Sequence, residues 1–312
     1  LGLYVGNQSL WTYSNAVSNT ISRKSLILMP TVTLGGTIGG EIEGGESEDD
    51  QEPAPEPQSG DYVDEYGINH GQGIRIGTTV WAPVNCGYHA TDYKYGKLYQ
   101  WGRKFGQGYS GGLYDGDFNY ICEYSDASVP EMVAGPVSLS VGQSEANAGK
   151  FYCNTNIPYD CFTPPYYNLW NSGTEDNPVK TEYDPCPEGW RVPTYSELSE
   201  LKSNHSSWTT DENDQTGYWF SGTEPYSESV PRVFFPAAGR RYGYGGNADD
   251  RGYFGYYCSS STDGTNAYGL DFGSGGVFKY LNARANGFSV RCVQEVSPSS
   301  FEDPIKNPEQ NW

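Results

Sequence analysis

An acidic, proline-rich stretch at residues 44–60 divides the chain and limits where a folded core can form. Its sequence, GGESEDDQEPAPEPQSG, holds no apolar side chain larger than alanine apart from proline. The carboxylates repel one another and the prolines hold the backbone extended, so the segment has nothing to bury. We therefore predict a disordered or semi-stiff linker here, and with it a domain boundary.

The linker leaves one long segment and two short ones. Residues 61–296 have a uniform composition and are predicted to form one domain. Residues 1–43 form a short β segment that cannot bury a core alone, so we expect it to pair with the main body, an upstream part or another subunit. Residues 297–312 are mostly polar and are expected to form a loose tail. The chain begins at Leu1 without a visible signal peptide, and we expect that a leader or upstream segment has been removed.

Aromatic residues rather than aliphatic ones must supply most of the core. The chain of 312 residues contains 27 Tyr, 12 Phe and 8 Trp, yet only 36% of its residues are hydrophobic. It also contains 40 Gly and 20 Pro, which disfavour helix interiors. This composition predicts a loop-rich α+β fold with an aromatic core and without long helices.

Local patterns predict several strands and one helix. Apolar runs or alternation predict strands at residues 74–81, 233–235, 253–258, 268–272, 277–281 and 288–292. Residues 98–101 are predicted to form a second short strand or the edge of a helix. Thr194 followed by Glu197 forms a capping box, which predicts a helix over residues 194–203. Residues 103–180 carry few periodic signals and are predicted to be a long region of loops.

Acidic residues outnumber basic ones, 39 to 19, which gives a formal charge of −20. Such a surface repels phosphate backbones and anionic membranes, so nucleic acid is not an expected partner. No stretch approaches the roughly 20 apolar residues that a transmembrane helix needs. The charge either keeps the protein soluble or binds a cation at an acidic loop. Calcium is then the candidate, at residues 115–117, 211–214 or 247–250, although none of these loops matches an EF-hand.

Seven cysteines are scattered through the chain without a CxxC pair, and there are only three histidines. A structural zinc site is therefore not expected, and the spacing suits disulfides in an oxidising compartment. Cys153 and Cys161 are close enough in sequence to clip a small loop, and we predict this disulfide. Since seven is odd, at least one thiol is free or paired with another molecule. No cysteine or histidine falls in a recognisable catalytic motif, so no catalytic residue is predicted.

Six blocks of sequence, in order along residues 76–293, resemble a known family. They are IGTTVWAPVN at 76–85, GKLYQWG at 96–102, DPCPEGWRVPT at 184–194, FPAAG at 235–239, YYCSSS at 256–261 and GFSVRCV at 287–293. Together they resemble the Fibrobacter succinogenes major paralogous domain, which occurs in secreted and outer-membrane proteins of Bacteroidetes and Fibrobacteres, often beside fimbrillin-like pilus domains. The family commonly carries Trp where this chain has Cys258. Residues 1–7 (LGLYVGN) similarly resemble the opening of a fimbrillin domain.

The resemblance implies a C-type-lectin-like domain at residues 61–296, with short twisted antiparallel strands and one or two short helices. It also implies a disulfide between Cys186 and Cys292, which belong to two of the matching blocks. A bridge between them closes a loop of about 106 residues, and such a closure stabilises a fold by about 4–5 kcal/mol. The related formylglycine-generating enzymes hold copper with paired cysteines, and no cysteine pair of this chain matches their pattern.

Aromatic and arginine side chains supply the predicted ligand-binding groups, because aromatic faces stack on sugar rings or on protein partners. The candidates lie in a Gly-rich stretch and after a Pro-Pro pair: Arg240, Arg241, Tyr242, Tyr244, Arg251, Tyr253 and Trp170. The alternative, expected for more than half of the aromatic residues in these stretches, is that they fill the core of a domain poor in aliphatic residues.

These observations lead to three hypotheses of function. The first is a non-enzymatic adhesin or pilus-associated subunit, including one at the pilus tip, that binds a glycan or a host or bacterial surface protein and contacts other pilus subunits. Its expected location is the cell surface or the extracellular space, in association with the outer membrane. The second is an enzyme of the formylglycine-generating type, and the third is a structural envelope domain without a specific ligand.

Overall fold

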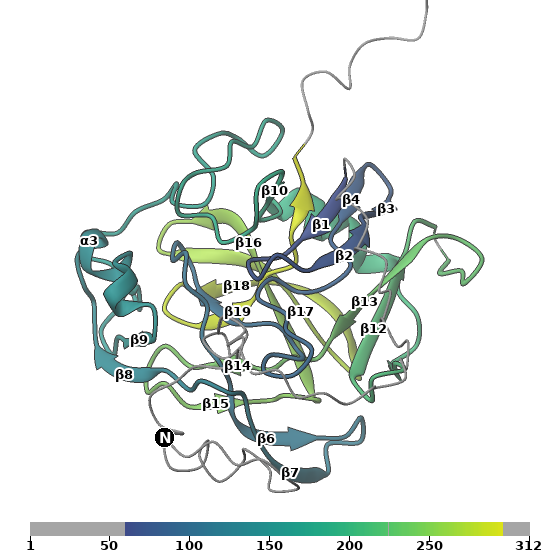
Figure 1. Cartoon of the computed structure of the whole chain (residues 1–312), viewed down its shortest axis with the longest axis horizontal. Helices are drawn as coiled ribbons and strands as arrows, with labels where there is room; N and C mark the ends of the chain where they lie inside the picture. The colour runs from purple at the N-terminus through teal and green to yellow at the C-terminus, as the bar shows by residue number, and fades with distance from the viewer. Residues whose placement is uncertain (1–59, 224, 296–312) are drawn as a thin grey trace, which may run out of the picture. The chain divides into compact units, whose positions relative to one another are not determined.

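A computed structural model describes residues 60–223 and 225–295 of the chain (Figure 1). The predicted β segment at 1–43, the linker at 44–60 except Gly60, and the tail at 297–312 lie outside these residues. The described part is mixed and strand-rich with a few short helices, in keeping with the predicted loop-rich α+β class. No helix among these residues combines the length and the apolar character that a membrane crossing requires.

A seven-stranded sheet forms the largest element of the described domain (Figure 1). Its strands are β5 (Leu98–Gln100), β14 (Arg240–Arg241), β15 (Ala248–Asp249), β16 (Phe254–Asp263), β17 (Asn266–Gly273), β18 (Gly276–Ala283) and β19 (Gly287–Ser289). The order is β15-β14-β19-β16-β17-β18, and β5 also pairs with β19. Strands β16, β17 and β18 form an antiparallel meander, whereas β19 runs parallel to β16. The predictions of strands at 253–258, 268–272 and 277–281 are confirmed by β16, β17 and β18, and of the two alternatives at 98–101 the strand is present as β5.

A four-stranded sheet joins early and late parts of the described chain. Its order is β10-β20-β4-β3, with β3 at Ile74–Ile76, β4 at Thr79–Trp81, β10 at Trp190–Arg191 and β20 at Val293–Gln294. The prediction of a single strand at 74–81 is wrong, because the chain turns back after Ile76, which pairs with Thr79. Gly77 has a φ of 58°, a left-handed conformation that glycine adopts without strain and that makes this tight turn possible. The predicted last strand at 288–292 is confirmed only in part, because β19 ends at Ser289 and β20 does not begin until Val293.

Smaller sheets complete the described fold. They are β1 (Asp61–Val63) with β2 (Asn69–Gln72), β6 (Ser110–Tyr114) with β7 (Tyr120–Ser125), β8 (Glu131–Ala134) with β9 (Lys150–Cys153), and β11 (Thr209–Thr210) with β12 (Thr216–Ser221) and β13 (Arg232–Pro236). The last of these confirms the strand predicted at 233–235. Residues 103–180 are therefore not only loops as predicted, since they contain β6 to β9. Strands β6, β7 and β8 escaped detection because their side chains are partly or fully exposed, so they lack the apolar alternation of a half-buried strand.

The predicted capping box begins a short helix. Helix α4 (Tyr195–Glu200) continues as a 3-10 turn, η2 (Leu201–Ser203). The hydroxyl of Thr194 accepts a hydrogen bond from the Glu197 amide, and the Glu197 carboxylate accepts one from the Thr194 amide, so two otherwise unpaired N–H groups are satisfied. A second short helix, α3 (Leu139–Gly142), and a 3-10 turn, η1 (Glu145–Asn147), lie between β8 and β9.

The core is aromatic, as the composition predicts, and arginine side chains run through it. Trp81, Trp101 and Tyr257 are each at most 1% exposed. Arg103 and Arg291 are 0% and 2% exposed, and each guanidinium donates hydrogen bonds to several backbone carbonyls. A loop-rich fold leaves many carbonyl groups without a partner in a helix or sheet, and buried arginine satisfies them.

The cysteines divide into one disulfide and several free thiols. The predicted disulfide between Cys186 and Cys292 is present, with its Cα atoms 5.9 Å apart and a sequence separation of 106 residues. The predicted disulfide between Cys153 and Cys161 is wrong, since both of these thiols are free. Cys161 is fully buried with its Sγ against the carbonyl of Trp101, whereas Cys153 is partly exposed at the end of β9. The two side chains occupy different environments, and nearness in sequence does not bring their sulfur atoms together.

Candidate functional site

Three of the predicted ligand-binding residues are buried, so the prediction is wrong for Arg241, Arg251 and Trp170. Their residues are 2%, 0% and 1% exposed. Arg241 donates a hydrogen bond to the carbonyl of Gly108, and Arg251 forms an ion pair with Asp126. These side chains join segments that are far apart in sequence, which leaves them no surface for a ligand.

Arg240 and Tyr242 lie together, as predicted, but in a cluster that satisfies its own charges. The Arg240 guanidinium lies 4.0 Å from the ring centroid of Tyr242 and 4.6 Å from that of Tyr256. Its nitrogen atoms also lie 3.3 Å and 3.2 Å from carboxylate oxygens of Asp249 and Asp250. The positive charge is thus paired within the protein.

The last two predicted candidates differ in exposure. Tyr253 packs against Phe118, with ring centroids 3.5 Å apart, and against Phe254. Tyr244 is 65% exposed and is the predicted candidate that stands most open to solvent. A lone exposed tyrosine offers a contact but not an enclosed site.

The acidic loops named as calcium candidates use their carboxylates internally. In the first loop, Asp115 Oδ1 accepts hydrogen bonds from the amides of Asp117 and Asn119. These amide hydrogen bonds hold the pKa of Asp115 below its ordinary value. Among the described residues, the side chains spaced to hold a metal ion are cysteines and not carboxylates.

Strands β12 and β13 carry a site that the sequence-based predictions missed. Tyr218 pairs with Phe235, and the next pair is Trp219 with Phe234. Because neighbouring residues of a strand point to opposite faces, Tyr218 and Phe235 enter the core while Trp219 and Phe234 turn to the other face. The rings of Trp219 and Phe234 lie 5.2 Å apart, and the Arg232 guanidinium lies 4.6 Å from the Trp219 ring. Figure 1 places these strands at one side of the described domain, beside the large sheet.

A cleft of about 260 Å³ opens beside these rings. The turn between β11 and β12 contributes Asp211, Glu212 and Asn213 to its wall, and the loop after β4 contributes Tyr88 and Lys94. Glu212 and Lys94 are exposed, and Tyr88 is partly buried. The cleft therefore combines an aromatic surface with carboxylate, amide and ammonium groups.

Hydrogen bonds hold the acidic wall of the cleft in place. Asp211 Oδ1 accepts from the amides of Asn213, at 2.9 Å, and Gln215, at 2.8 Å. The side-chain amide of Gln215 donates to the carbonyl of Lys94 at 2.8 Å, which joins this turn to the opposite wall. The polar groups of the cleft are thus preorganised by the protein's own contacts.

A buried arginine lies beneath the cleft. Arg291 donates hydrogen bonds to Asn85 Oδ1 and to the carbonyls of Ala82, Pro83 and Phe234. Burial lowers the pKa of Arg291 to about 10, which still leaves the guanidinium charged at neutral pH. Within the described residues its partners are neutral oxygens, so the floor of the cleft carries positive charge.

The signal for this site was present in the sequence. In TGYWFS and RVFFP, Trp219 and Phe234 occupy the positions that alternate with the core residues, and a large ring on the non-core face of a strand is a candidate contact surface. The arrangement can bind a ligand that has both apolar faces and hydrogen-bonding groups. Comparisons with protein-family models, with curated proteins and with solved structures found no match to this chain.

Proposed function

We propose that this chain is the ligand-binding part of an exported surface protein, an adhesin or pilus-associated subunit, and that the cleft beside Trp219 binds a glycan. The observation that carries the proposal is the Trp219 ring, which lies beside Phe234 and Arg232 on the non-core face of β12 and β13. A partly exposed indole beside preorganised polar groups is poorly explained by packing alone.

The chemistry of the cleft matches that of a sugar. A sugar ring has apolar C–H faces, which pack on aromatic rings, and hydroxyl groups, which exchange hydrogen bonds with carboxylates and amides. Glu212 and Asn213, both exposed, present such groups on the cleft wall. The volume of about 260 Å³ lies near the roughly 300 Å³ at which small-molecule pockets begin, which favours a short saccharide over a folded partner.

The proposal that this chain lies at a bacterial surface rests on its sequence. The six blocks that resemble the Fibrobacter succinogenes major paralogous domain favour a C-type-lectin-like fold and a surface or pilus protein. The strand-rich fold and the disulfide between the segment leading to α4 and the last strand are compatible with that assignment. The charge of −20 suits a domain that stays soluble outside the cell.

A glycan array followed by calorimetry tests the proposal. We expect the full chain to bind at least one class of short glycan, and Trp219→Ala to weaken that binding about tenfold or more, since tenfold corresponds to about 1.4 kcal/mol. Tyr280→Ala is the matched control, because Tyr280 is a 60% exposed aromatic residue on β18 outside the cleft. Equal binding by the Trp219→Ala variant, or binding to no glycan on the array, would contradict the proposal.

A further inference from the structure

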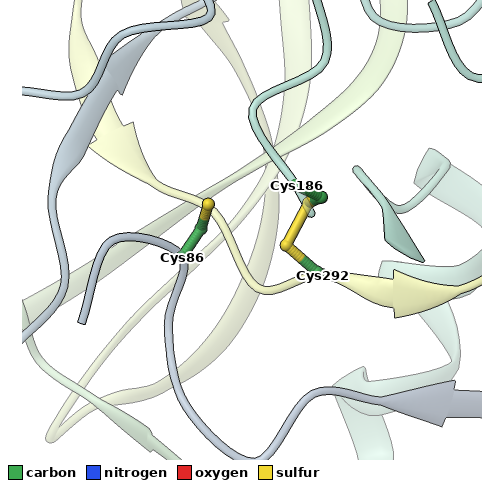
Figure 2. Close-up of side chains that lie close together, drawn as sticks. All are labelled: Cys86, Cys186 and Cys292. Atoms are coloured by element: carbon green, nitrogen blue, oxygen red, sulfur yellow. A yellow bond between two sulfur atoms is a disulfide. The ribbon is translucent and has the colours of Figure 1, made fainter. Parts of the chain in front are cut away.

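Three cysteine sulfur atoms lie together in the described domain. Cys86 comes from the loop after β4, Cys186 from the loop before β10, and Cys292 directly precedes β20. Their three Sγ atoms lie within 4.8 Å of one another. Figure 2 shows the free Cys86 side chain beside the disulfide that joins the other two. Segments about 100 and 200 residues apart thus place three soft ligand atoms at one point.

A tyrosine hydroxyl lies beside the sulfur atom of Cys86, and another lies beside that of Cys292. Tyr99 Oη donates a hydrogen bond to Cys86 Sγ at 3.3 Å, and Tyr62 Oη lies 3.7 Å from Cys292 Sγ. The Cys86 thiol donates to the carbonyl of Pro185 at 3.4 Å. Hydrogen bonds from protein groups to a thiolate sulfur are typical of the surroundings of metal-bound cysteine.

The spacing fits a single thiolate-bound cation once the disulfide is opened. Zinc binds thiolate sulfur at about 2.3 Å, so two sulfur atoms on one tetrahedral zinc ion lie about 3.8 Å apart. The three Sγ atoms of the cluster lie within 4.8 Å of one another, so only a small movement brings them to the spacing of a zinc site after the disulfide is opened.

A pocket of about 470 Å³ reaches this cluster and supplies an entry path. Cys86, Cys186 and Tyr62 line its wall, together with charged residues that include Glu65 and Lys180. Lys180 Nζ donates to the carbonyl of Cys186 at 2.6 Å and lies 3.6 Å from Asp184 Oδ1, so its ammonium charge is paired with this buried carboxylate.

We propose that Cys86, Cys186 and Cys292 form a metal site in the reduced protein, which binds one thiophilic divalent cation such as Zn²⁺, and that the disulfide and the metal are alternative states of the same site. A phosphine or dithiol reductant supplies two electrons, and two protons are taken up as the disulfide becomes two thiols. Binding of the cation then releases three protons as three thiolates form. The pocket leaves room for a water molecule or a ligand atom at the fourth position.

Cobalt(II) titration of the full chain tests this inference independently of glycan binding. The chain is reduced anaerobically with a phosphine, freed of excess reductant, and checked by circular dichroism. We expect one Co²⁺ per chain with a thiolate-to-cobalt charge-transfer band, displacement of Co²⁺ by Zn²⁺, and no such band in the oxidised protein. Cys86→Ser, which keeps the disulfide in the oxidised state, should bind at least about 100-fold more weakly after reduction, because it loses a direct ligand.

Two further variants make the result specific. Cys122→Ser removes an exposed thiol outside the cluster and should leave binding unchanged. Tyr99→Phe keeps the ring but removes the hydroxyl that donates to Cys86 Sγ, and should weaken binding about tenfold. The inference is overturned if the reduced chain takes up no cobalt, if Cys86→Ser binds as tightly as the wild-type chain, or if the reduced chain unfolds and metal does not restore its structure.

Discussion

Arg251 and Asp126 form an ion pair that is closed off from solvent. The Arg251 Nη1 atom lies 3.2 Å from Asp126 Oδ1, and both side chains are 0% exposed. Asp126 Oδ2 also accepts a hydrogen bond from the Tyr109 amide, and the Arg251 guanidinium lies 3.9 Å from the Tyr109 ring centroid. The pair joins the segment after β7 to the segment before β16 and thereby anchors the β6–β7 hairpin.

Removing the acid from this pair should destabilise the domain strongly. Asp126→Ala leaves a buried guanidinium without its counter-charge, and we expect the free energy of unfolding to fall by about 3–5 kcal/mol. Urea denaturation followed by tryptophan fluorescence measures this change. The double variant Asp126→Leu, Arg251→Met replaces both charges by apolar groups and should recover much of the loss. A loss below about 1 kcal/mol for Asp126→Ala would show that the pair contributes little.

The disulfide should contribute a large share of the stability. We expect replacement of both Cys186 and Cys292 by serine to lower the free energy of unfolding by about 4–5 kcal/mol, because the unfolded chain regains the freedom of a 106-residue loop. Denaturant unfolding of the oxidised proteins measures the difference. Cys122→Ser, at an exposed free cysteine, is the control and should change the value by less than about 0.5 kcal/mol. An equal effect of the two replacements would contradict the interpretation.

The Thr194 cap at the start of α4 is expected to contribute less to stability than the disulfide does. Thr194→Ala removes the hydroxyl that accepts from the Glu197 amide, and we expect a loss of about 1 kcal/mol in the free energy of unfolding. Ser196→Ala, at an exposed position of the same helix, should be close to neutral. Thermal and urea unfolding of the two variants compare them directly, and equal stability of both would rule out a role for the cap.

A partly buried carboxylate on β17, that of Asp271, should make stability depend on pH. Burial raises the pKa of Asp271 from 3.8 to about 6, although hydrogen bonds from Asn282 oppose the shift. A raised pKa means that the folded state binds the proton more tightly than the unfolded state does. The free energy of unfolding should therefore fall as pH rises from about 4 to 6.

The variant Asp271→Asn removes this titration. We expect it to raise the free energy of unfolding at pH 7 by about 1–2 kcal/mol, to have little effect at pH 4, and to flatten the slope between these values. Part of the slope should persist, since burial also raises the pKa of Asp184 to about 6. Urea unfolding at a series of pH values gives the measurement, and an unchanged slope in the variant would contradict the assignment to Asp271.

Features encoded within a few residues could be predicted from the sequence. The capping box of Thr194 and Glu197 predicted α4, because a cap depends on side chains and amides three residues apart. Alternating apolar residues predicted β17, because each strand residue faces the core or its opposite side in turn. The composition predicted an aromatic core, and the resemblance of two blocks to a known family implied the disulfide between Cys186 and Cys292.

The tertiary structure alone decided which rings and arginines are buried and which lie at the surface. Arg251 looked like a surface group in its Gly-rich segment, yet its partner Asp126 lies 125 residues away along the chain. Cys153 and Cys161 are neighbours in sequence but not bonded, while Cys86 meets a disulfide formed by two distant residues. An arginine or a thiol has no fixed preference for core or surface; its place depends on whether distant carbonyls, carboxylates and sulfur atoms arrive beside it, and only the folded chain brings them there.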